Sequence, residues 1–149
     1  MAVRYTKFQS THKVDVVGAV TLTGSADDIK VIDLTAAPHR HGVHWFALVI
    51  QNASLNGDIT LKAKGNTAAN GSGTDVTLQT MTIDSADTDA VLEIPCELLS
   101  HFSDRNDLVL KSLIFEATGT QYDTLDAVVV TKPMQEQDGL TPSDPTTVT

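Results

Sequence analysis

Cysteine is almost absent from this sequence. Cys96 is the single cysteine, so no disulfide can form within one chain. The fold therefore does not depend on the oxidative cross-links of small secreted domains, and we expect assembly in a reducing cytoplasm. The N-terminal residues Met1–Lys7 lack the apolar stretch of a secretion signal, and no window approaches the roughly 18 consecutive apolar residues of a membrane-spanning helix. We predict no membrane partner.

Positive charge and aromatic residues are also scarce. Ten Lys and Arg residues stand against 19 Asp and Glu, which gives a net charge of −9. A field of that sign repels phosphates, so we predict no nucleic-acid partner. Aromatic residues make up 5% of the chain. This weighs against a carbohydrate-binding module, which needs exposed aromatic platforms for sugar rings; Tyr5 and Tyr122 are the candidates for that alternative.

Sequence motifs for catalysis are missing. There is no Gly-x-Ser-x-Gly elbow for a nucleophile, and Gly71-Ser72-Gly73 lacks the Gly-Lys-Ser/Thr ending of a phosphate-binding loop. Cys96 has no histidine nearby until His101, which is typical of a structural thiol. We predict that the chain is not an enzyme and needs no cofactor.

The most suggestive polar cluster contains His39, His41 and His44. Three imidazoles within six residues could bind a transition metal, and jelly-roll enzymes of the cupin type use a His-x-His pair. The cupin pattern continues with a glutamate a few residues later, whereas Trp45–Ile50 follows here and no glutamate occurs before Glu93. We therefore predict no metal site, with a cupin-like metal-binding protein kept as an alternative.

The most apolar run, Trp45–Asn52, predicts the central strand of a β-sandwich, because it is too short for an ordinary helix. Eight or nine short strands separated by turns follow from the whole chain. We predict an all-β fold, a single β-sandwich of the jelly-roll type. A polar, basic N-terminal arm (1–13) and a flexible C-terminal tail (133–149) flank the sandwich domain (14–132).

The region after the central strand predicts three local features. Asn56-Gly57 favours a tight type I′ hairpin turn into the strand Asp58–Lys64. In that strand Ile59, Leu61 and Ala63 would face the core, together with Phe46, Leu48 and Ile50 of the central strand, whereas Thr60, Lys62 and Lys64 would face water. Gly65–Thr74 is predicted to be an exposed, mobile loop, and the changed alternation in Asp75–Ile83 predicts either a β-bulge or a strand that changes partner.

Two strands carry more apolar residues than one core requires. Trp45, Ala47 and Val49 form a stripe opposite the core, and Leu108–Ala117 is apolar on both faces, with Leu113 and Phe115 on the second face. A neighbouring subunit could cover this surplus, and loops or arms of the same chain are the alternative. We predict a homo-oligomer interface that contains Trp45, Val49, Leu113 and Phe115.

The Ala/Thr/Val/Asp-rich strands, polar arms, single cysteine and missing signal resemble the small β-sandwich virion proteins of tailed bacteriophages, particularly capsid decoration or cement proteins. The resemblance covers the full length without a signature motif. It implies a trimer on the outer capsid surface that binds the major capsid protein and stabilises the head. In the basic arm, Arg4, Tyr5, Lys7 and Phe8 are the predicted docking residues, because aromatic residues anchor interfaces and basic ones suit an acidic capsid exterior.

Overall fold

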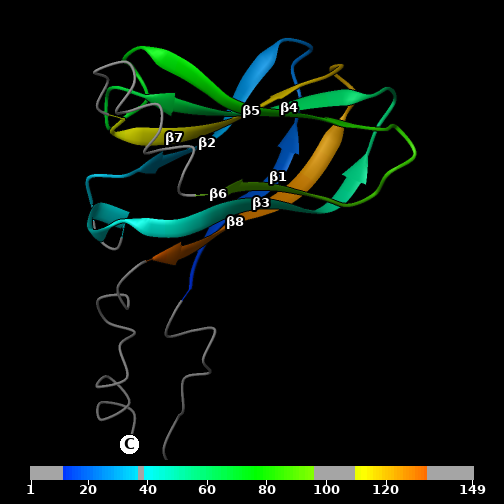
Figure 1. Ribbon diagram of the computed structural model, residues 1–149. Helices are drawn as coiled ribbons and strands as arrows, with labels where there is room; N and C mark the ends of the chain where they lie inside the picture. The colour runs from blue at the N-terminus through cyan, green and yellow to red at the C-terminus, as the bar shows by residue number, and fades with distance from the viewer. Residues whose placement is uncertain (1–11, 37–38, 96–109, 134–149) are drawn as a thin grey trace, which may run out of the picture.

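The structure, a computed structural model, describes residues 12–36, 39–95 and 110–133 (Figure 1). These residues form eight strands and one short 3₁₀ turn, η1 (His39–His41). The strands are β1 (Lys13–Thr21), β2 (Ala26–Asp33), β3 (Val43–Ser54), β4 (Ile59–Asn66), β5 (Asp75–Ile83), β6 (Ala90–Pro95), β7 (Ser112–Thr118) and β8 (Thr124–Pro133).

The strands form two antiparallel sheets of four, which lie as stacked layers in Figure 1. Sheet A has the order β1-β8-β3-β6, and sheet B has the order β2-β7-β4-β5. The chain crosses between the sheets at every connection except β4 to β5, which pair as neighbours. This eight-stranded order is that of a jelly roll, so the predicted fold class is confirmed.

The core lies between the two sheets and contains the inward residues predicted for both strands of the central region. Phe46, Leu48 and Ile50 of β3 are at most 1% exposed. Ile59, Leu61 and Ala63 of β4 are fully buried on the opposing sheet. Alternating polarity therefore identified the inward face of each strand correctly.

The predicted hairpin at Asn56-Gly57 is wrong, because β3 and β4 belong to different sheets. Asn56 instead joins the connection to the β7–β8 loop: its backbone N–H donates to Asp123 Oδ1 at 2.7 Å, and its side-chain amide donates to the Tyr122 carbonyl at 3.1 Å. Asp123 is fully buried and also accepts from the backbone N–H of Thr120 at 2.6 Å. These long-range bonds hold a crossing between sheets where the local sequence favours a tight turn.

The predicted exposed, mobile loop at Gly65–Thr74 is also wrong in its first part, because β4 continues through Asn66. Asn66 is fully buried, and its Oδ1 accepts from the backbone N–H groups of Ala68 and Gly73 at 2.8 and 2.9 Å. Its Nδ2 donates to Asp75 Oδ1 at 2.6 Å. The buried amide thus fixes the base of the β4–β5 loop to the sheet.

Single-residue bulges change which face a strand presents. In β5, Gln79 pairs with Ala63 and Thr77 with Lys64, so Leu78 is an additional residue and the predicted bulge in Asp75–Ile83 is confirmed. In β1, Val16 pairs with Val128 and Gly18 with Ala127, which leaves Val17 as the additional residue. Gly18 has a φ of 85°, a conformation that glycine adopts without the strain of a side chain.

Candidate interaction surface

One row of outward positions on sheet A is apolar across all four strands. Val128 pairs with Val16 on one side and Val49 on the other, and Val49 pairs in turn with Val91. Residues paired across antiparallel strands share one face of the sheet, so these side chains form a continuous row of four valines. Val16 is 69% exposed and Val91 is 56% exposed.

A second outward row lies beside the first. Val130 pairs with Val14 and with Ala47, and Val14 is 43% exposed. Ala47 pairs in turn with Glu93 of β6, so this row ends in an exposed carboxylate. We call the valine face the six outward valines of sheet A: Val14, Val16, Val49, Val91, Val128 and Val130. Valines at paired positions pack against each other well in a sheet, but this does not remove their outer surface from water.

One end of the valine face carries rings and a positive charge. Lys132 pairs with Trp45 in the next row of outward positions. The His12 ring tilts against Trp45, with 5.6 Å between the centroids and 50° between the planes. Trp45 is half-buried as a result of this cover and of its place in the central strand β3.

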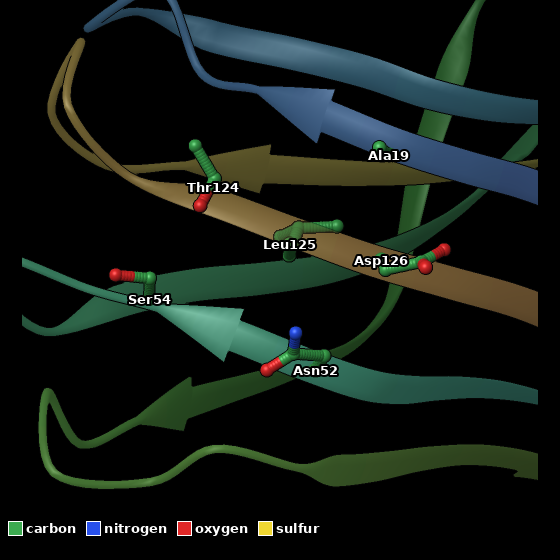
Figure 2. A pocket seen from close by; sticks show the side chains of 6 residues that line it. All are labelled: Ala19, Asn52, Ser54, Thr124, Leu125 and Asp126. Carbon is green, nitrogen blue, oxygen red and sulfur yellow. The ribbon is translucent and has the colours of Figure 1, made fainter.

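The other end of the valine face is polar. A hollow of about 190 Å³ lies there, lined from three adjacent strands by Ala19, Asn52, Ser54, Thr124, Leu125 and Asp126. Figure 2 shows these six side chains. Asp126 pairs with Asn52, and Thr124 pairs with Ser54. The outward face of sheet A thus runs from a cationic, aromatic end through valines to an end of hydroxyl, amide and carboxylate groups.

The outward face of sheet B is built around an ion cluster in which Lys64 and Glu116 are largely buried, whereas Asp28 and Asp75 are nearly half exposed. Lys64 Nζ lies 2.6 Å from Glu116 Oε2 and 3.1 Å from both Asp28 Oδ1 and Asp75 Oδ2. The Lys64 side chain is only 10% exposed, so the prediction that it faces water is wrong. Burial opposes its charge, but hydrogen bonds to the three carboxylates outweigh burial and raise the pKa of Lys64.

A loop of the same chain covers the apolar part of this second face. Ile114 points outward from β7 and is nevertheless 1% exposed. A Cβ placed on Gly71, in the β4–β5 loop, would lie 3.1 Å from Ile114 Cδ1 and 3.4 Å from Val31 Cγ1. The loop backbone therefore packs directly on Ile114 and Val31. On this face, a loop of the same chain covers the surplus apolar residues, as in the alternative to a covering subunit that the sequence left open.

The four predicted interface residues separate into two pairs. Trp45 and Val49 lie on the outward face of sheet A, as their alternation with Phe46 indicates. Leu113 and Phe115 are fully buried in the core cluster, so placing them on an outward face was wrong. The predicted docking residues, Arg4, Tyr5, Lys7 and Phe8, lie outside the described residues.

Most of the valine face was missed in the sequence. The run Ala127–Val130 is apolar on both faces, as are the central strand and Leu108–Ala117, and this was the available signal for Val128 and Val130. Val14 and Val16 alternate, but a plain alternation continued to Val20 would place all three valines on one face. The bulge at Val17 separates them.

The histidine cluster is not assembled into one site. His39 is 8% exposed, its ring packs against Phe46 with 5.6 Å between centroids, and its Nδ1 lies 3.2 Å from the Asp33 carbonyl. Burial lowers the pKa of His39 and so favours the neutral ring. His44 is exposed, and the side chain of His41 lies outside the described residues. Nowhere in the described part of the chain do three or more His, Cys, Asp or Glu side chains gather in a way that could hold a metal ion.

The fold and surface define a jelly-roll β-sandwich with one apolar outer face. None of the described segments forms a helix with the length and hydrophobicity that a membrane crossing requires. No protein-family model matches the chain, and no curated protein matches it.

Three solved structures are similar in fold. The first is a structure of Bacillus endospore appendages, described as disulfide-linked pili, at 12% identity over 89% of this chain and 97% of that chain, with a TM-score of 0.48. The second is the empty capsid of Triatoma virus, at 13% identity over 83% of this chain and 88% of that chain, with a TM-score of 0.42.

The third is the CBM22-1-GH10 part of Clostridium thermocellum xylanase 10B, solved with xylohexaose, at 9% identity over 84% of this chain and 27% of that chain, with a TM-score of 0.40. Identities and TM-scores of this size do not indicate a shared function.

Proposed function

We propose that this chain is a structural virion protein of a tailed bacteriophage, a capsid decoration or cement protein. In this role it self-associates, binds the lattice of the major capsid protein on the outer capsid surface and stabilises the head. The observation that supports the proposal is the valine face: Val14, Val16 and Val91 remain between 43% and 69% exposed on one flat sheet. Contiguous apolar patches on a folded domain mark surfaces that another macromolecule covers.

The basic arm supplies the second contact in this proposal. Arg4, Lys7 and Lys13 give the first thirteen residues a charge of +3, whereas residues 14–132 carry −9. An acidic capsid exterior would attract such an arm and repel the body, so the arm would set the orientation of docking. Tyr5 and Phe8 would anchor it, because aromatic side chains commonly fill pockets at interfaces.

Carbohydrate binding, the alternative function, receives no support from the described aromatic side chains. Phe46 and Phe115 are fully buried, and Trp45 lies under the His12 ring. Within residues 12–36, 39–95 and 110–133, Tyr122 is the one exposed aromatic residue outside the histidines. A single tyrosine on a loop does not make a platform for a sugar chain.

The test is fractionation of virus particles and re-binding. We expect the chain to co-sediment with gradient-purified capsids, to be removed by salt, and to re-bind when the salt is diluted. A chain that lacks residues 2–11 should fold, bind capsids more weakly and lose the salt dependence. Removal of only these residues spares His12, which contacts Trp45. Absence of the chain from purified particles would refute the proposal, and unchanged re-binding of the truncated chain would refute the role of the arm.

A further inference from the structure

We propose that the valine face binds the same face of a second copy of this chain, so that two sandwiches stack through their A sheets about a two-fold axis. This inference rests on the self-association within the proposed function and names its surface and partner. A two-fold contact uses one patch twice, so the patch must be complementary to itself. The outward residues of β1, β8 and β3 on sheet A meet that requirement.

Strand β8 shows the self-complementarity most directly. Its outward residues, in order, are Asp126, Val128, Val130 and Lys132. The two valines are equivalent, whereas the charges at the two ends are opposite. A copy of β8 laid antiparallel over itself would therefore place valine on valine and Lys132 of each chain opposite Asp126 of the other.

The same rotation suits two of the three neighbouring strands. An axis that runs across the strands, between the two rows, places Val14 over Val16 on β1 and Ala47 over Val49 on β3, whereas at the β6 edge it places Val91 over Glu93. It also places Trp45 over the polar end, at Asn52, where the indole N–H meets hydrogen-bonding groups. No two like charges of the outward rows of β8 face each other in this arrangement.

The dimensions also fit an interface between two copies. Strands lie about 4.8 Å apart, and outward positions follow at about 6.8 Å along each strand, so the two rows that carry the valines cover roughly 250 Å² and the four rows from Asp126 to Lys132 cover roughly 500 Å². The whole face is the size of the largest functional patches on monomers, with the valine rows as the apolar centre of an interface and the ends that carry Lys132 and Asp126 as its polar rim. Two sheets that pack with their strands nearly aligned repeat the packing inside the sandwich itself.

A contact of this kind closes with two copies. The resemblance to decoration proteins implies a trimer, and a trimer would need two different surfaces on each chain. Mass in solution therefore distinguishes the arrangements. We expect twice the 15.9 kDa of one chain by light scattering at micromolar concentration.

Trp45 is the single tryptophan and borders the valine face, so its fluorescence reports on this surface alone. On dilution we expect the emission to shift to the red over the concentration range in which the mass halves. A monomer at 100 µM, a trimer, or a dimer whose Trp45 emission stays constant on dissociation would each overturn the proposal.

Two substitutions test the valine face without disturbing the core. Val16→Asp and Val91→Asp change exposed side chains on the two edge strands of sheet A, and we expect each to weaken association at least tenfold. Val31→Asp is the matched control, because Val31 is 37% exposed on the outward face of sheet B. Circular dichroism verifies that each variant folds. Equal association by all three variants would overturn the proposal.

A charge exchange tests the antiparallel register. Lys132→Asp and Asp126→Lys each place like charges opposite one another, so each should weaken the dimer about tenfold at low salt, and the double variant should recover most of the affinity. Failure of the double variant to recover would overturn this register. The mass and the capsid binding of the wild-type chain together separate the two proposals. A wild-type dimer that does not bind capsids refutes only the virion function, and a wild-type monomer that binds capsids refutes only the dimer.

Discussion

The apolar residues on the two outer faces of this sandwich differ in how far the chain covers them. On sheet B, the β4–β5 loop folds back over Ile114, and Lys64 forms ion pairs with three carboxylates. On sheet A, three of the six outward valines are exposed and the other three are half-buried. Within the described residues, the same architecture thus covers the apolar part of one outer face and leaves that of the other exposed.

The difference teaches where stability and association are located in this molecule. Ile114 and Lys64 on the outer face of sheet B are buried in the single chain, so their substitution should lower the free energy of unfolding. Val14, Val16 and Val91 of the valine face are exposed in the single chain, so we expect their substitution to change association and leave unfolding nearly unchanged. The expected effects below are ordered from the largest to the smallest.

Lys64→Ala should have the largest effect, about 3–5 kcal/mol of lost stability, because it leaves three neighbouring carboxylates without their cation. The raised pKa of Lys64 means that its contribution is complete below about pH 10 and is lost only as the pH rises through the folded value. In the variant, carboxylate repulsion should make stability rise as the pH falls from 7 towards 5. Urea unfolding measures both effects. Lys62→Ala, two residues earlier on β4, is the control and should change stability by less than about 1 kcal/mol; equal losses would contradict the role of the cluster.

Ile114→Ala and Val16→Ala make the comparison between the faces directly. Ile114 is 1% exposed beneath the loop, so its truncation should cost about 2–4 kcal/mol. Val16 is 69% exposed, so its truncation should change the unfolding of the monomer by no more than about 0.5 kcal/mol. Thermal and urea unfolding at a concentration where the chain is monomeric provide the measurement. Similar losses of unfolding free energy at both positions would show that the two faces contribute equally to the stability of the single chain.

Asp123→Asn tests a residue that belongs to neither face. Burial disfavours the Asp123 carboxylate, but hydrogen bonds from the backbone N–H groups of Asn56 and Thr120 outweigh burial and lower its pKa. A lowered folded pKa stabilises the fold above about pH 4, and this contribution is lost as the pH falls. We expect a loss of about 1–3 kcal/mol at pH 7 that shrinks by pH 3, with association unchanged. The exposed Asp89→Asn is the control, and a loss that does not depend on pH would contradict this account.

Gly71→Ala should have the smallest of these effects, a loss of about 1 kcal/mol. Gly71 has a φ of 82°, and the added Cβ would press on Ile114 Cδ1 at 3.1 Å. Gly57→Ala is the matched control, because its Cβ meets no atom within 4 Å and its φ is not in the left-handed region. That change should be neutral or slightly stabilising, since alanine restricts the unfolded chain. A gain in stability at Gly71 would show that the loop does not rest on Ile114 as described.

Sequence alternation was sufficient for the fold class and for the inward faces of β3 and β4. It failed where both faces of a strand are apolar: in β7 it could not show that Leu113 and Phe115 point into the core and Ile114 outward. The turn at Asn56-Gly57 failed for another reason. A local turn preference does not reveal whether the next strand returns to the same sheet or crosses to the other, and here Asp123, 67 residues away, holds the crossing.

The candidate surface was predicted only where one strand revealed it. Trp45 and Val49 could be placed because β3 alternates with large inward residues. The remaining valines come from strands that are neighbours only in the folded sheet, and their alignment into rows depends on register. Register depends on how distant segments pair, so the local pattern of one sequence does not predict it.

The extra residue Val17 determines which residues before it in β1 face outward and which face the core. If the strand kept Val17 and lost the bulge, Lys13 and Asp15 would turn outward, and Val14 and Val16 would turn into the core. If Val17 itself were deleted, Val16 and Gly18 would follow each other as in a regular strand, and both valines would stay outside. A gain or loss of one codon that shifts this phase would therefore replace the outward Val14 and Val16 by the charged Lys13 and Asp15 at the β1 edge of the valine face.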